Sequence, residues 1–164
     1  MKKVLLILAC GIATQLSYAQ ATPKWADKAK KAVFSIVTYD KDNKIKNTGN
    51  GFYINENGTA LSDYTLFEGA ERAVIINADS KELPVLRILG ANSMYDIVKF
   101  NTEADKKTIA LKSASQPASV GETVYLLPYS TQKAATCQTG TVTKVDTIGD
   151  KAYYYTLAMT TNEK

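Results

Sequence analysis

The sequence predicts an all-β protein, and three observations support this class. From residue 32 onward, short apolar or alternating runs are separated by turn residues, which is typical of successive antiparallel strands. The chain contains ten tyrosines and many valines, isoleucines and threonines, all of which favour strands. Helix-forming alanines and lysines gather only near the start. With 164 residues, of which 45% are hydrophobic, the chain is long enough for one core or two small ones.

The runs divide into two groups. The first is expected to form six strands, at residues 32–39, 51–54, 59–62, 73–78, 83–89 and 96–100. Between them, residues 40–47 and the triplet Gly90-Ala91-Asn92 are interpreted as turns. The second group contributes only three strands, at residues 123–127, 136–145 and 152–159. Because natural sheets rarely leave an apolar edge unpaired, we expect this second unit to be incomplete within the chain and to self-associate through its open side.

The first residues have the pattern of a secretory signal peptide. Lys2 and Lys3 precede a short apolar run, and Ser17 and Ala19 are the small residues of a cleavage site. We therefore expect residues 1–19 to be removed and the protein to be exported to the periplasm or secreted. The apolar run is shorter than the roughly 20 residues needed to span a bilayer, so no membrane span is predicted. The alternatives are a buried strand or helix and lipid attachment at Cys10.

Residues 20–31 contain Pro, an early Asp and several helix formers, which predict a short N-terminal helix. The charge balance, 20 basic against 16 acidic residues, becomes 18 against 16 without Lys2 and Lys3. That balance gives no electrostatic reason to expect a nucleic-acid partner.

The chain contains no histidine, which removes the commonest zinc ligand and the usual physiological general base. After cleavage at Ala19, Cys137 would be the only cysteine, so neither a disulfide nor a cysteine-rich zinc site is expected. We predict no cofactor and no metal. Cys137 itself is expected to be a buried or half-buried strand thiol rather than a nucleophile.

Residues 47–70, NTGNGFYINENGTALSDYTLFEGA, resemble the first-barrel segment of HtrA-type trypsin-like serine proteases. Residues 73–100, 118–130 and 136–145 are similar to further segments of that family, in the same order. The resemblance extends over about residues 32–164. It implies a chymotrypsin-like double β-barrel, with a complete first barrel over residues 32–106 and a truncated second barrel over residues 107–164.

The resemblance also assigns catalytic positions. The aspartate of the family's Ser-His-Asp triad falls on Asp96, and the histidine position falls on Thr65, or on Tyr64 if the register slips by one residue. The nucleophilic serine would lie beyond Lys164 and is absent from this chain. Because neither threonine nor tyrosine is a base near neutral pH, we expect a pseudoprotease that binds an extended peptide or protein segment along a strand edge.

Two other functions remain open at this point. The chain could be part of an active secreted endopeptidase with a different base, or a structural β-domain unrelated to proteases. A structure lacking a closed six-stranded barrel at residues 32–103 would favour the second alternative. A different site is also considered, in which Asp63 approaches Asp96 as a calcium-binding or glycosidase-like carboxylate pair.

Overall fold

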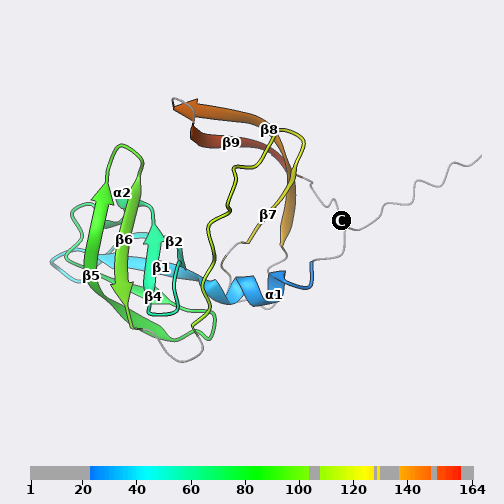
Figure 1. The fold of residues 1–164 in the computed structure, drawn as a ribbon. Helices are drawn as coiled ribbons and strands as arrows, with labels where there is room; N and C mark the ends of the chain where they lie inside the picture. The colour runs from blue at the N-terminus through cyan, green and yellow to red at the C-terminus, as the bar shows by residue number, and fades with distance from the viewer. Residues whose placement is uncertain (1–22, 104–107, 128, 130–136, 149–150, 160–164) are drawn as a thin grey trace, which may run out of the picture.

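The computed structural model describes residues 23–103, 108–127, 129, 137–148 and 151–159 (Figure 1). The predicted signal peptide lies outside these residues, as does the start of the predicted helix. From residue 23 onward, the predicted helix is one α-helical turn, α1 (Ala26–Ala29), followed by a 3-10 turn, η1 (Lys30–Ala32). Ala26 and Ala32 are fully buried, so the small side chains hold the turn against the rest of the molecule.

Six strands close into one barrel, in the order β1-β2-β3-β6-β5-β4, with β4 pairing back onto β1. All neighbouring strands are antiparallel. The strands are β1 (Val33–Tyr39), β2 (Ile45–Tyr53), β3 (Thr59–Ser62), β4 (Arg72–Ile76), β5 (Glu82–Asn92) and β6 (Ile97–Thr102). Closure leaves the barrel without an unpaired outer strand, which is one way in which all-β proteins avoid edge association.

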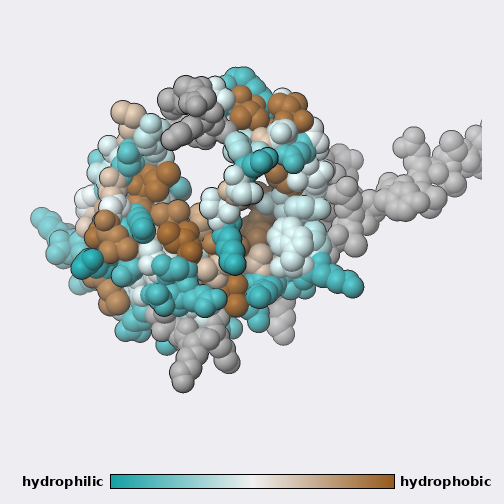
Figure 2. Space-filling view, viewed as in Figure 1, coloured by the Kyte–Doolittle hydropathy of each residue, from teal (hydrophilic) through white to brown (hydrophobic). Residues whose placement is uncertain are grey.

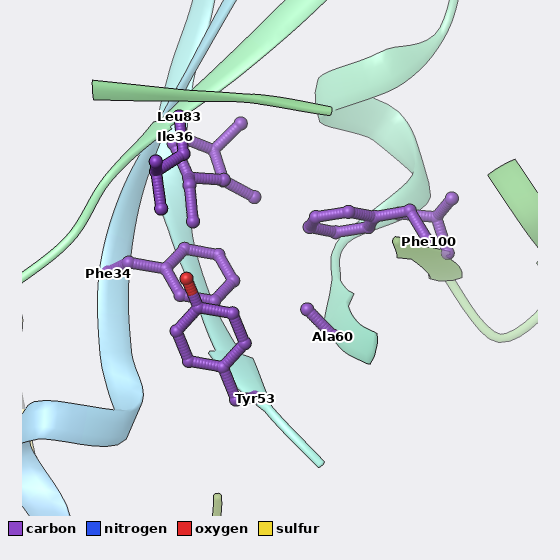
Figure 3. Packing of buried hydrophobic residues seen from close by; sticks show 8 residues of the cluster. Phe34, Ile36, Tyr53, Ala60, Leu83 and Phe100 are labelled. Atoms are coloured by element: carbon purple, nitrogen blue, oxygen red, sulfur yellow. The ribbon is translucent and has the colours of Figure 1, made fainter. Parts of the chain in front are cut away.

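The core of the barrel is aromatic and aliphatic (Figure 3). It consists of Phe34, Ile36, Tyr53, Ala60, Ile75, Leu83, Val98 and Phe100. The ring of Phe34 lies edge-on to the rings of Tyr53 and Phe100. Its centroid is 4.8 Å from that of Tyr53 and 6.2 Å from that of Phe100. These inward-facing residues alternate with exposed ones along β6, as expected for strands with one buried face.

One predicted turn is shorter than expected, and another is wrong because its residues form a strand. The expected turn at residues 40–47 ends at Lys44, because the Asp40 carboxylate accepts hydrogen bonds from the N–H groups of Asp42 and Lys44. This tight turn leaves β2 free to begin at Ile45 and pair with β1. Likewise, Gly90-Ala91-Asn92 belongs to β5, since these residues pair with Lys99, Val98 and Ile97 of β6.

Three further strands form a separate antiparallel sheet in the order β7-β8-β9. They are β7 (Thr123–Leu126), β8 (Gln138–Ile148) and β9 (Lys151–Met159). Among the described residues, β7 and β9 each pair only with β8, so the sheet is open on both sides. Figure 1 shows this sheet beside the barrel, joined to it by the long segment that follows β6.

Contacts of the connecting segment and of β7 link this part of the chain to the barrel and to the N-terminal turn. The Leu111 N–H donates a hydrogen bond of 2.8 Å to the carbonyl of Tyr53, which places the connecting segment on the barrel. Trp25, next to α1, lies edge-on to Tyr125 of β7, with centroids 5.2 Å apart. In the part of the chain that is described, no helix is long and apolar enough to cross a membrane.

Candidate functional site

The site is centred on α2 (Tyr64–Phe67), a four-residue helix that follows β3 directly. The first N–H groups of a helix have no partner within the helix, and a side-chain oxygen usually accepts from them. Asp63 occupies the N-cap position but its side chain makes no capping bond. At the other end, the Leu66 carbonyl accepts from the Thr38 hydroxyl at 3.0 Å and from the Asn47 amide at 3.1 Å.

Asp96 supplies the capping oxygen from the turn between β5 and β6. One oxygen of its carboxylate, Oδ1, accepts from the Thr65 N–H at 2.7 Å and from the Thr65 hydroxyl at 2.8 Å. Its carbonyl accepts from the Tyr64 N–H at 3.2 Å. Two residues that are 31 positions apart in the sequence are thus in direct side-chain contact.

The backbone of Asp96 is held in the left-handed region, with φ of 50°. Aspartate adopts this conformation more readily than most non-glycine residues, although at some energetic cost. The preceding turn is closed by the Asn92 side chain, which accepts from the Tyr95 N–H at 3.1 Å. This bond within the turn helps to hold the backbone that directs the Asp96 carboxylate toward α2.

The two carboxylates of the site have opposite pKa shifts. The hydrogen bond from the Thr65 N–H, followed by that from its hydroxyl, lowers the pKa of Asp96 because both favour the ionised form. Partial burial, and then the negative charge of Asp96, raise the pKa of Asp63. Asp96 thus stays ionised to a lower pH than an isolated aspartate, whereas Asp63 takes up a proton at a higher pH than an isolated aspartate.

The structure places Thr65, Asp96 and Asp63, all named from the sequence, next to one another. Thr65 faces Asp96, while the side chain of Tyr64 packs against the hydrophobic core of the barrel. Of the two positions considered for the family's histidine, Thr65 donates to the Asp96 carboxylate through its hydroxyl, and Tyr64 donates to the Asp96 carbonyl through its backbone N–H. Among the described residues, no group of three or more potential metal-ligating side chains is present, which gives no support to a calcium site at Asp63 and Asp96. Cys137 is half-buried and free, directly before β8.

A groove of about 590 Å³ lies beside this site, between the barrel and the second sheet, and we call it the inter-sheet groove. Its barrel wall includes Phe52, Ser62, Asp63 and Ile97, and its other wall is formed by residues 125–127. Sequence reasoning missed this groove because its residues come from six separated segments of the chain. The only signal in the sequence was that Phe52 and Ile97 are large apolar residues on the outward-facing positions of their strands.

Replacing Thr65 with valine is expected to raise the pKa of Asp96. The Thr65→Val side chain keeps the shape of threonine but cannot donate to the carboxylate, while the backbone N–H bond remains. The pKa should therefore move toward the ordinary aspartate value without reaching it. Carboxyl carbon chemical shifts followed by NMR during an acid titration would measure this change.

The matched control is Thr143→Val, which removes a hydroxyl that bonds within the second sheet and should leave the pKa of Asp96 unaltered. A wild-type Asp96 whose pKa is at or above that of an ordinary aspartate would contradict the geometry.

The lowered pKa of Asp96 also has a consequence for stability. Because the pKa is lower in the folded than in the unfolded chain, ionised Asp96 stabilises the fold at a pH above its unfolded-state pKa. That stabilisation is lost as the pH falls through its folded-state pKa.

Comparison with known proteins gives evidence for the fold alone. No protein-family model matches the chain, and no curated protein matches its sequence. Among solved structures, the chain is similar to the serine endoprotease from Yersinia pestis, with a TM-score of 0.60 and 17% sequence identity. The match covers 73% of this chain and 43% of the endoprotease chain, so the chain spans less than half the length of this structural neighbour. With its closed six-stranded barrel and its partial second sheet, the chain has a chymotrypsin-like, serine-protease-like fold.

Proposed function

We propose that this chain is an exported protein with a peptidase fold that has no catalytic activity and binds an extended peptide. The observation that carries the proposal is the contact between Thr65 and Asp96, at 2.8 Å. The resemblance to HtrA-type proteases assigns the histidine of the triad to Thr65, the residue that donates to Asp96. A hydroxyl thus takes the hydrogen-bonding role of an imidazole without its acid-base chemistry.

The chemistry of this pair argues against a general base. A triad histidine accepts the nucleophile's proton while its own second N–H is held by the aspartate. The Thr65 hydroxyl already donates its only proton to Asp96 and would need a strong base to lose it. The lowered pKa of Asp96 makes that carboxylate a weaker base than an ordinary aspartate. The chain also contains no histidine that could act from elsewhere.

Peptide binding is supported by the inter-sheet groove and by the edge of β7. Grooves of about 300–1,000 Å³ are the usual size for ligand sites, and this one is about 590 Å³. Tyr125 and Leu126 of β7 line it, and β7 has no partner other than β8 among the described strands. An extended segment lying in the groove would be able to add to β7 as a further strand and leave its side chains to contact the barrel wall.

The experiment for this proposal is selection from a randomised peptide library. The purified chain is incubated with the library, bound peptides are recovered, and mass spectrometry reads both their sequences and their integrity. We expect a subset of peptides to be enriched and every enriched peptide to be intact. Enriched peptides that are cleaved would instead favour an active endopeptidase, and the absence of enrichment would reject peptide binding.

Export is proposed on the pattern of Lys2, Lys3, the apolar run and Ala19, all of which lie outside the described residues. The mature protein should then begin at Gln20. A mature protein from the exporting cell that retains Met1 would rule out cleavage.

Self-association is proposed through the open face of the second sheet. Leu157 and Met159 of β9 are 36% and 37% exposed, and Leu126 of β7 is 50% exposed. Together with Tyr155 and residues 113–118, they line an apolar hollow of about 480 Å³. A second copy of the chain would cover these side chains, so the sedimentation coefficient should rise with protein concentration and should do so less in a Leu157→Lys variant.

A further inference from the structure

The inter-sheet groove combines an apolar surface with one acidic end. Phe52 and Ile97 on its barrel wall are 36% and 46% exposed, and Leu126 on the opposite wall is 50% exposed. These are large apolar side chains facing water, which is the surface that a ligand side chain would cover. In Figure 2 the space between the barrel and the second sheet is open on this side of the molecule.

The acidic end is formed by Asp63, which lines the groove, with Asp96 as its charged neighbour. Neither residue belongs to an ion pair among the described residues, where the pairs are Asp27 with Lys30 and Lys144 with Asp146. The Asp96 carboxylate accepts hydrogen bonds from Thr65, whereas the Asp63 carboxylate makes no capping hydrogen bond to α2. Two like charges close together favour a cation, because a cation offsets their repulsion.

This charge arrangement determines which ligands suit the groove. An acidic peptide or a phosphate backbone would bring further negative charge to Asp63 and Asp96. A wholly apolar peptide would cover Phe52 and Ile97 but would leave the repulsion between the two carboxylates without a compensating positive charge. A peptide with both an apolar and a basic side chain satisfies both parts of the groove.

We infer that the inter-sheet groove selects extended peptides in which an apolar residue and a lysine or arginine are separated by one residue. In an extended strand, residues i and i+2 point to the same side, so both side chains would face the barrel wall. The apolar side chain covers Phe52 and Ile97, and the basic side chain lies beside Asp63. The inference rests on the proposed peptide-binding function and adds to it the class of peptide.

The test compares labelled peptides that differ at one position, with the full chain and fluorescence anisotropy as the readout. One peptide has Leu-Ala-Lys at its centre, and its partner has norleucine in place of the lysine. Norleucine keeps most of the aliphatic stem and removes the charge. We expect the lysine peptide to bind about five- to tenfold more tightly at neutral pH and low salt.

The Asp63→Asn variant should lose most of the preference for lysine, since it removes the carboxylate that lines the groove and leaves only the charge of Asp96 beside it. The matched control is Glu68→Gln, which removes another exposed carboxylate next to α2 that does not line the groove. This control should keep the preference for lysine. As the pH falls and Asp63 takes up a proton, the wild-type preference should weaken to the level of the Asp63→Asn variant, whose own weak preference should stay constant while Asp96 remains ionised.

The outcomes separate the two proposals. Equal binding of the two peptides by the wild-type chain would overturn the basic-residue preference and leave peptide binding intact. A preference that is undiminished in the Asp63→Asn variant would also overturn it, because the charge would then be recognised elsewhere. If no peptide binds, peptide binding itself fails, and the preference with it.

Discussion

Replacing Gly51 with alanine is expected to destabilise the barrel severely. Gly51 lies in β2, opposite Ser62, and a Cβ added there would be 2.5 Å from Cε2 of Phe34 and 2.8 Å from the backbone oxygen of Leu61. Phe34 is fully buried in the aromatic core, and the Leu61 oxygen belongs to the neighbouring strand, so neither can move freely. Overpacking of this kind costs about 1–3 kcal/mol or more in free energy of unfolding.

The measurement is thermal or urea unfolding of both proteins, where each kcal/mol lowers the melting temperature of a small domain by about 4–8 °C. Gly90→Ala is the matched control. Gly90 also lies in a barrel strand, but an added Cβ would meet nothing within 4 Å. Its stability should stay within about 1 kcal/mol of the wild type. Equal stability of the two variants would mean that β2 does not lie against Phe34 as described.

Amide hydrogen exchange is expected to differ strongly between the barrel and the second sheet of a monomer. Every barrel strand has partners on both sides, and most buried side chains lie there. In the second sheet, Val142 is the one buried hydrophobic side chain among the residues whose burial is described, and both described outer strands have a free edge. Local opening costs least where few apolar contacts hold a segment.

We therefore expect amides of β1 to β6 to exchange at least about a hundredfold more slowly than those of β7 to β9, which corresponds to roughly 3 kcal/mol of opening free energy. Raising the protein concentration should slow exchange in β9 if the second sheet pairs with another copy. Equal protection of both regions in a dilute monomer would contradict the description of the second sheet as an open unit.

Much of the fold could be predicted because strands with one buried face leave a pattern in the sequence. All nine runs identified from apolar alternation overlap the observed strands. The errors arose where backbone pairing or a side-chain bond decided the outcome. Ile45 joins β2 because the Asp40 carboxylate closes the preceding turn early, and Gly90 joins β5 because β6 offers it a partner.

The candidate site was less predictable. The helix α2 is four residues long and is capped by Asp96 from another strand turn, so its own sequence contains too little information to predict it. The pairing of Thr65 with Asp96 was expected only through the resemblance to HtrA-type proteases. The opposite pKa shifts of Asp63 and Asp96 depend on distances and burial, which alternation patterns do not describe.

Hydrolysis of casein by the purified chain tests most directly the proposal that this peptidase-like fold has no acid-base catalysis. Release of soluble peptides is followed from about pH 5 to about pH 9, a range in which a catalytic base would have to act. We predict release no faster than in buffer alone, at every pH, for the wild type and for Asp96→Asn alike. Turnover by the wild type that falls in Asp96→Asn would show that this site catalyses the reaction and would contradict the account.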